Sequence, residues 1–250
     1  MALQRADQLL VQRGLVRSRT LAQKLIREGL VYVTTPHGVE ALDKAAQKLP
    51  TDTQFELRES AEQRYVSRAG LKLEGALMAL GLDVRDLRAL DIGQSTGGFT
   101  DCLLRHGCAT VVGVEVGHGQ LDAALRGDQR VQCLENRNAR ELDSSWFEQM
   151  FELVVMDVSF ISQTRILPRL APVMSAGANL VSLVKPQFEV GPEGLGKGGI
   201  VRDERLFPVV RNKIEQCLQQ HGLTAKHFLP SVILGGDGNR EFFVHAQKCI

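Results

Sequence analysis

Two lysines and two acidic residues in the later part of the chain carry the groups needed to act on a hydroxyl. They are Lys72, Asp157, Lys185 and Glu241. Asp157 and Lys185 each end an apolar run, and Glu241 begins one. Lys72 lies on a predicted helix between Ala69 and Ala76, so small side chains flank it and its ammonium can reach into a cleft. Such groups can orient a hydroxyl or take its proton, although a single lysine on a helix is more often a surface residue.

A glycine-rich segment at residues 90–99 has the pattern of a strand, a tight turn and a helix. The strand pattern ends at Asp91, and a helical pattern follows the glycines. Three residues separate Gly93 from Gly97, which is not the spacing of a dinucleotide site. Because a carboxylate suits an ammonium better than a pyrophosphate, the segment predicts an S-adenosylmethionine site, with an ordinary strand-to-helix turn as the alternative. The predicted cofactor residues are Asp91, Gly93, Ser95, Thr96, Gly97, Gly98 and Phe99.

Other polar residues stand at the carboxyl ends of predicted strands, where doubly wound sheets bind their ligands. Glu115 can accept hydrogen bonds from both hydroxyls of a ribose, and the Asn138 amide could read an adenine edge. Each has an ordinary interpretation as a polar residue at a strand end. Together they predict one charged cleft, so Glu115, Asn138 and Asp157 join the predicted cofactor site. The pattern indicates no metal site.

The segment after the fourth predicted strand argues against two other kinds of methyl transfer. Enzymes that methylate the adenine amino group place Asn or Asp, two prolines and an aromatic residue there, whereas this chain has Asp157-Val158-Ser159-Phe160. Methylation of cytosine C5 needs a nucleophilic cysteine, usually after a proline, and none of the five cysteines follows a proline. A hydroxyl therefore remains as the expected methyl acceptor.

From residue 65 onward, apolar strand patterns alternate with amphipathic helix patterns. The predicted strands are 87–90, 110–116, 131–134, 153–158, 179–184, 226–234 and 241–247. The predicted helices are 65–80, with Ser67 as a cap, 98–106, 120–125, 161–174 and 204–221. Continuous apolar runs between helices predict a parallel sheet covered on both faces, and the glycines at 235–238 predict a final hairpin. Residues 65–250 are thus predicted to form an α/β, Rossmann-like methyltransferase domain: a seven-stranded, mostly parallel sheet with one antiparallel edge strand.

Residues 1–58 predict a second, small α+β domain. Its predicted elements are helices at 7–14 and 19–28, with Ser18 capping the second, strands at 31–33 and 55–57, and a turn at 34–38. The first thirty residues carry six cations and only two acids; the cations are Arg5, Arg13, Arg17, Arg19, Lys24 and Arg27. This arrangement resembles an S4 RNA-binding domain, in which such residues grip phosphates; a solvated helix face is the alternative. The polar residues 59–64 predict a linker.

The composition is that of a soluble, reduced chain. Of the 250 residues, 44% are hydrophobic, and the net charge is +1, so no global charge favours nucleic acid. The odd number of cysteines, without a Cys-x-x-Cys pair, indicates a cytoplasmic protein. No signal peptide and no stretch of about 18 apolar residues occurs, so no membrane contact is expected. A monomer is the default expectation.

Six segments of the chain resemble the TlyA group of ribosomal RNA methyltransferases, which join an S4 domain to an FtsJ-like domain. They are 65–74, 90–102, 113–120, 156–162, 184–197 and 238–242. The resemblance implies that Lys72, Asp157, Lys185 and Glu241 are the catalytic tetrad. It also implies 2′-O-methylation of cytidine in 16S or 23S ribosomal RNA, with S-adenosylmethionine as donor and ribosomal RNA or subunits as partner. Lys185 would take the hydroxyl proton, Asp157 would hold the ammonium groups, and Glu241 would orient Lys72 or the ribose.

A glycine-rich stretch, residues 190–199, follows Lys185 and predicts a lid or an RNA-contacting loop. Lys197 and Arg202 could touch phosphates there. Two other functions stay open. One is RNA binding with an inactive cofactor domain, and the other is membrane activity, because such proteins are also labelled hemolysins. The amphipathic pattern at 204–221 does not favour membrane activity, since any helix that covers a sheet shows the same pattern.

Overall fold

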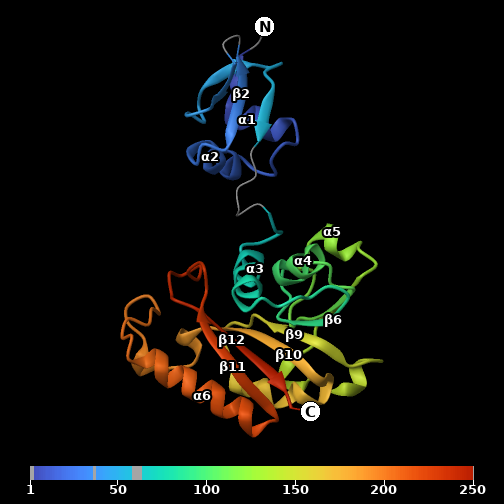
Figure 1. Cartoon of the computed structure of the whole chain (residues 1–250). Coiled ribbons are helices and arrows are strands. Elements are labelled where there is room, and N and C mark those ends of the chain that lie inside the picture. Colours follow the sequence, from blue (N-terminus) through green and yellow to red (C-terminus); the bar gives the residue numbers. More distant parts are fainter. Residues whose placement is uncertain (1–2, 36–37, 58–63, 250) are drawn as a thin grey trace. The chain divides into compact units, whose positions relative to one another are not determined.

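The computed structural model describes residues 3–35, 38–57 and 64–249 (Figure 1). The chain divides into two compact units, residues 1–64 and 65–250. Of the predicted linker, residues 59–63 lie outside the described residues, as does Arg58 before it. Within the described ranges, no helix combines the length and the apolar character needed to cross a bilayer.

The first unit packs two helices against short antiparallel strands. Its elements are β1 (Leu3–Arg5), α1 (Ala6–Gln12), α2 (Arg19–Arg27), β2 (Val31–Thr35), β3 (Gly38–Ala41), β4 (Lys48–Pro50) and β5 (Phe55–Leu57). β2 lies between β3 and β5, and β1 pairs with β4. The Leu21 amide donates to Ser18 Oγ over 3.2 Å, which confirms the predicted cap of α2. Leu9, Leu25 and Val31 are buried in the shared core.

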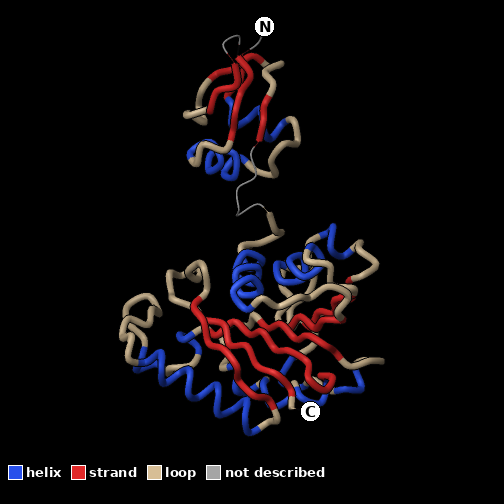
Figure 2. Tube along the Cα trace, viewed as in Figure 1, coloured by secondary structure: helices blue, strands red, loops and turns tan. Residues whose placement is uncertain are grey.

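The second unit is built on a seven-stranded sheet (Figure 2). Its strands are β6 (Arg88–Ile92), β7 (Thr110–Val114), β8 (Val131–Leu134), β9 (Phe151–Met156), β10 (Met174–Val184), β11 (Leu223–Pro230) and β12 (Phe242–Lys248). Their order is β11-β12-β10-β9-β6-β7-β8. β6 to β10 pair in parallel, and β12 runs antiparallel to β10 and β11. The predicted sheet and final hairpin are confirmed. The antiparallel strand lies one place in from the edge rather than at the edge itself.

Helices cover both faces of this sheet (Figure 1). α3 (Ala69–Leu80), α4 (Gly98–Arg105) and α5 (Ala123–Arg126) lie on one side, and α6 (Leu206–Gln220) lies on the other. Alternate residues of the strands pack into two separate hydrophobic cores, one on each face of the sheet. Leu153 and Val155 of β9 join the core under α3 and α4. Val154 and Met156 join the core with Ile214 of α6. Burial on both faces explains why the strands are continuously apolar.

The connection between β9 and β10 differs most from the prediction. The helix predicted at 161–174 does not form. Three 3-10 turns take its place: Gln163–Arg165, Leu167–Arg169 and Ala171–Val173. Pro168 and Pro172 lack the amide hydrogen that a continuous helix would use. The apolar side chains are still buried, which is why their spacing resembled that of a helix.

Two smaller predictions in this unit are also wrong. Arg68, not Ser67, is the N-cap of α3, and no side chain caps this helix. The helix predicted at 120–125 is reduced to α5, whose N-cap Asp122 accepts a hydrogen bond from the Ala124 amide. Ser67 instead lies against the glycine-rich turn after β6.

Candidate active site

The glycine-rich turn brings three backbone segments together at the end of β6. Gly93 has a φ of 81°, and a Cβ there would lie 2.3 Å from the Asp157 carbonyl oxygen. A Cβ on Gly98 would lie 2.2 Å from Ser67 Oγ. Glycine is therefore required for the turn to contact both the end of β9 and the segment before α3.

Most of the predicted cofactor residues of this turn line a small cavity of about 140 Å³. They are Gly93, Ser95, Thr96, Gly98 and Phe99, and Asp157 from the end of β9 joins them. Gly97 is not among the lining residues. It is the N-cap of α4 with a φ of 93°, and a Cβ there would lie 2.4 Å from Leu125 Cδ1. Its role in the structure is to let the turn pack against α5.

A larger cavity of about 640 Å³ continues from the turn and is lined by Gly93, Glu115, Asn138 and Asp157 among others. The Glu115 carboxylate is held by two backbone amides: Ser95 N and Gly117 N each donate to it over 2.8 Å. Asn138 Oδ1 accepts from the Arg140 amide over 3.1 Å. This volume lies in the range of small-molecule sites, about 300 to 1,000 Å³. The turn, the cavity and the fixed carboxylate fit S-adenosylmethionine.

Asp91 lies behind the turn rather than on the cavity wall. It is fully buried, and its Oδ2 accepts a hydrogen bond from Thr100 Oγ1 over 2.7 Å. Gln94 Nε2 donates to the same hydroxyl over 2.9 Å, while Asp91 Oδ1 has no hydrogen-bond partner among the described residues. Burial raises the pKa of Asp91 to about 7. The sequence pattern did not indicate Gln94, whose amide packs on Gly113 of β7.

The four predicted catalytic residues form two ion pairs. Lys185 Nζ lies 2.6 Å from Asp157 Oδ1, and Lys72 Nζ lies 2.5 Å from Glu241 Oε2. The Lys72 and Glu241 side chains are only 8% and 3% exposed, so their charges are compensated inside the protein. Within the described ranges, no three His, Cys, Asp or Glu side chains group closely enough to hold a metal ion.

Strand register explains why these four residues meet. Asp157 directly follows β9, and Lys185 directly follows the parallel neighbour β10. β12 enters the sheet in the opposite direction and pairs Phe242 with Val184, so Glu241 lies beside the end of β10. Lys72 of α3 reaches the same edge and pairs with Glu241. The antiparallel insertion of β12 therefore positions Glu241, the acidic partner of Lys72.

The two ion pairs share a third cavity of about 520 Å³, lined by Lys72, Lys185 and Glu241. Lys185 also lines the small cavity at the glycine-rich turn. Ser159 lines all three cavities and accepts a hydrogen bond from Lys185 Nζ over 2.8 Å. The cavities are therefore joined at Lys185 and Ser159, the point where the predicted cofactor and catalytic residues meet.

An exposed aromatic ring stands at this junction. Phe160 is 91% exposed, has a positive φ of 63° and borders both large cavities. Its ring centroid lies 5.3 Å from that of Phe188, in the turn after β10. A non-glycine residue with positive φ is uncommon. In the sequence, Phe160 stands out only by the absence of prolines around it, and no local pattern indicates that its ring is exposed beside a cavity.

A buried carboxylate ties together the two segments that carry Asp157 and Lys185. Glu189 accepts hydrogen bonds from Ser162 Oγ at 2.6 Å, from the Gln163 amide at 2.7 Å and from Lys213 Nζ of α6 at 2.8 Å. Its side chain is 1% exposed. The loop after β9 and the turn after β10 are therefore fixed against each other and against α6.

The glycine-rich loop after Lys185 is anchored rather than free. Asn239 is fully buried, accepts from the Val201 amide at 2.9 Å and donates to the Gly199 carbonyl at 3.1 Å. Leu195, Gly198 and Gly199 of this loop line the 520 Å³ cavity. Lys197 is exposed on the same loop. The loop thus forms a wall of the cavity, and its role as a lid or an RNA-contacting segment stays a prediction.

In the first unit, several of the predicted RNA-binding cations already have protein partners. Arg5 and Arg19 pair with the buried Asp7 at 2.9 and 3.1 Å, and Arg5 above all holds the pKa of Asp7 well below its ordinary range. Arg13 donates to the Thr51 and Thr53 carbonyls. Lys24 lies 3.8 Å from Glu28. The side chains of Arg17 and Arg27 are exposed.

Comparisons with known proteins agree with this architecture. Residues 65–248 match the model of the FtsJ-like methyltransferase family, and residues 4–33 match the S4 domain. The chain is 42% identical over 240 residues to the Mycobacterium tuberculosis 16S/23S rRNA (cytidine-2'-O)-methyltransferase TlyA, covering 96% of this chain and 88% of that one. It is 39% identical to Hemolysin A of Brachyspira hyodysenteriae, covering 96% of this chain and 98% of that one.

A solved structure from Streptococcus thermophilus that carries the name hemolysin superposes with a TM-score of 0.75 at 41% identity, covering 100% of this chain and 90% of that one. The match to the family model spans the whole of the second unit's sheet and the loop with Lys185. The chain therefore belongs to the FtsJ-like methyltransferases, within their TlyA group, and is an S-adenosylmethionine-dependent methyltransferase with an S4 domain.

Proposed function

We propose that this enzyme methylates the 2′-hydroxyl of a cytidine in ribosomal RNA. The carrying observation is the pair of lysine–carboxylate contacts, Lys185 with Asp157 and Lys72 with Glu241, beside the glycine-rich turn. Lys185 gives the joined cavities a group that can accept a hydroxyl proton. No cysteine that could act as a nucleophile is among the residues that line them. The ribose, the cytidine and the ribosomal RNA are those in the name of the tuberculosis relative.

The residues of the chain suit this transfer. When bound, S-adenosylmethionine supplies a methyl group already activated by its sulfonium. Lys185 Nζ, between Asp157 Oδ1 and Ser159 Oγ, is the atom that we assign to receive the hydroxyl proton. Its ammonium first releases one proton to solvent, and the resulting amine takes the hydroxyl proton as the methyl group is transferred. Such base assistance contributes about 10²- to 10⁴-fold in rate. The Lys72–Glu241 pair would hold the ribose in the 520 Å³ cavity.

Other parts of the molecule suit an RNA substrate. The exposed Phe160 ring offers a stacking surface for a base that leaves its helix. Exposed cations on the first unit, Arg17 and Arg27, and Lys197 on the loop beside the cavity can meet phosphates. An S4 domain and a cavity beside the catalytic lysines would together hold one RNA at two places. The expected partner is therefore ribosomal RNA or a ribosomal subunit.

The test is transfer of tritium from labelled S-adenosylmethionine to purified ribosomal subunits, followed by mapping of 2′-O-methyl nucleotides. Lys185→Met removes the amine but keeps much of the side-chain length. We expect at least a roughly hundredfold loss of rate, while S-adenosylmethionine still binds in equilibrium dialysis. Lys226→Met, at an exposed lysine of β11, is the matched control.

Three outcomes would overturn the proposal. Full activity of Lys185→Met would remove Lys185 from the chemistry. A wild-type protein that binds ribosomal RNA but transfers no label would be an RNA-binding protein with an inactive cofactor domain. A label found on a base instead of a ribose would likewise contradict 2′-O-methylation.

A further inference from the structure

The 520 Å³ cavity contains an acidic residue that methyl transfer does not use. Asp237 lies on the loop between β11 and β12 and lines this cavity together with Gln187, Phe160 and Phe188. A Cβ on Gly235 would lie 2.8 Å from Asp237 Oδ1 and 2.7 Å from Glu241 Oε1. The two carboxylates therefore flank the same glycine, so Asp237 borders the ribose end of the cavity without belonging to either ion pair.

Three donors hold the Asp237 carboxylate in one orientation. The Asn239 amide donates to Oδ1 over 3.0 Å, Asn239 Nδ2 donates to Oδ2 over 2.9 Å, and Gln187 Nε2 donates to Oδ2 over 3.2 Å. An ionised carboxylate has about four acceptor positions. One position therefore remains, on Oδ1.

Asp237 is a fixed anion that can only accept hydrogen bonds. Burial pushes its pKa upward, but the hydrogen bonds from Asn239 and Gln187 outweigh burial and leave the pKa below its ordinary value. Asn239 is itself fully buried and also bonds to Gly199 and Val201. The carboxylate is thus held by a rigid anchor and not by a free loop.

The two pyrimidines differ in what they offer to such a group. At position 4, cytosine carries an amino donor and uracil carries a carbonyl acceptor, and carboxylates in proteins accept from the cytosine amino group. We propose that Asp237 accepts a hydrogen bond from the 4-amino group of the target base and thereby selects cytidine over uridine. Phe160 and Phe188 supply the stacking surface beside it. This inference rests on the proposed function and assigns its base specificity to one residue.

The test compares two substrates and two variants. Subunits are taken from cells that lack the enzyme, with the mapped cytidine kept or replaced by uridine in the ribosomal RNA gene. We expect the wild-type kcat/KM to favour cytidine by about ten- to hundredfold. Asp237→Asn can turn either an acceptor or a donor toward the base, so its preference should fall to about threefold or less. Asp203→Asn, at an exposed carboxylate paired locally with Arg205, should keep the wild-type preference.

The outcomes separate this inference from the function beneath it. No label transfer by the wild type would defeat the proposed function. Wild-type methylation of cytidine with an unchanged preference in Asp237→Asn would defeat the inference alone, as would a mapped target that is uridine or a purine. If Asp237→Asn does not fold, Asp237→Ser takes its place, because a hydroxyl removes the anion yet can still face either base.

Discussion

Replacing Asp91 by asparagine tests how the buried carboxyl behind the glycine-rich turn affects stability. Its ordinary pKa is 3.8, and burial raises it to about 7. Between these two values the folded protein keeps a proton that the unfolded chain has released. Stability must therefore fall as pH rises through this interval and level off above it. Asparagine has nearly the same shape and cannot ionise, so the variant should lack this slope.

The size of the effect follows from the two pKa values of Asp91. Each pH unit in the interval corresponds to about 1.4 kcal/mol, so the full cost of ionising the buried group is about 4 kcal/mol. Between about pH 5.5 and about pH 8.5 the change is about 2 kcal/mol. The variant keeps an acceptor for Thr100 Oγ1 but sets an amide where Oδ1 has no partner. That penalty does not depend on pH. The test therefore compares how the free energy of unfolding changes with pH, and not its absolute value.

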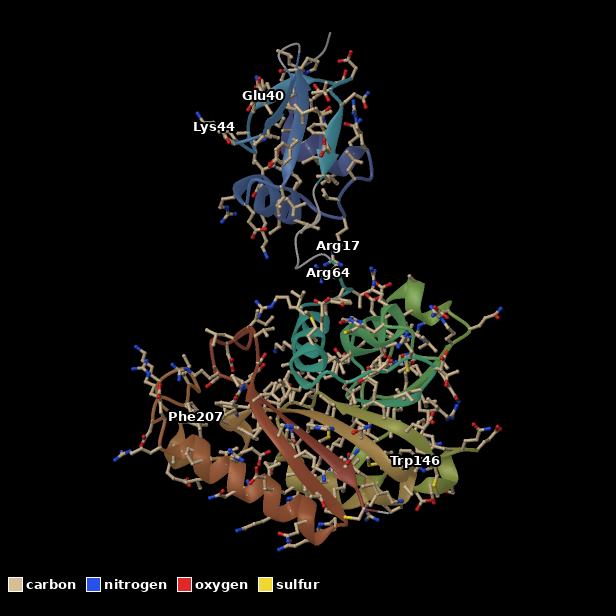
Figure 3. All side chains as sticks on the ribbon, viewed as in Figure 1. Arg17, Glu40, Lys44, Arg64, Trp146 and Phe207 are labelled. Atoms are coloured by element: carbon tan, nitrogen blue, oxygen red, sulfur yellow. The ribbon has the colours of Figure 1, made fainter. Side chains whose placement is uncertain are left out.

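The measurement is urea unfolding of the full chain at several pH values, followed by tryptophan fluorescence. Trp146 is the single tryptophan of the sequence and lies in the second unit, on the connection between β8 and β9 (Figure 3). It packs against the core that contains α6, so its emission reports the unit that holds Asp91. The free energy of unfolding of wild type minus variant should fall by about 2 kcal/mol from about pH 5.5 to about pH 8.5.

A difference that stays flat across this range would refute the reasoning. Other titrating groups, such as His245, whose pKa is lowered by burial first of all, act equally in both proteins and cancel in the difference. Asp128→Asn is the matched control. The pKa of Asp128 is lowered to about 2 by Arg130, so it titrates below the range and should give a flat difference.

Two further substitutions test the walls of the site. Glu189→Ala removes the acceptor of Ser162 Oγ and of the Gln163 amide, whereas Lys213, 39% exposed, keeps the Glu189 carbonyl and solvent, so we expect unfolding to become easier by about 2 kcal/mol. Methyl transfer should fall while S-adenosylmethionine binding persists. If the variant is as stable as wild type, Glu189 does not fix these two segments. Phe160→Ala should leave stability unchanged because the ring is 91% exposed. It should raise KM for ribosomal subunits by about ten- to hundredfold, and Phe160→Tyr should restore it; an unchanged KM for the alanine variant would exclude stacking.

Features that depend on neighbours in the sequence were predictable. The alternation of apolar strands and amphipathic helices indicated the parallel sheet, because a strand buried on both faces must be apolar throughout. The glycines after Asp91 indicated a tight turn between a strand and a helix, and the structure has this turn between β6 and α4, with a positive φ at Gly93 and at Gly97. The helical spacing of apolar residues at 161–174 led to a wrong prediction of an α-helix. In the structure these buried side chains lie on 3-10 turns, two of which contain a proline.

Features that depend on contact between distant segments were decided only by the tertiary structure. Lys72 and Glu241 are 169 residues apart, and they meet because β12 is inserted antiparallel beside β10 under α3. Contacts between distant segments also placed Glu189 and Asn239, which no motif marked. In the first unit, the packing of α2 against α1 brought Arg19 to Asp7. The partners of a side chain depend on strand order and helix packing, and the spacing of nearby residues predicts neither of these. Local sequence patterns were therefore enough to predict the fold class and the residue types of the site, whereas the pairing of the charges depended on how the whole chain folds.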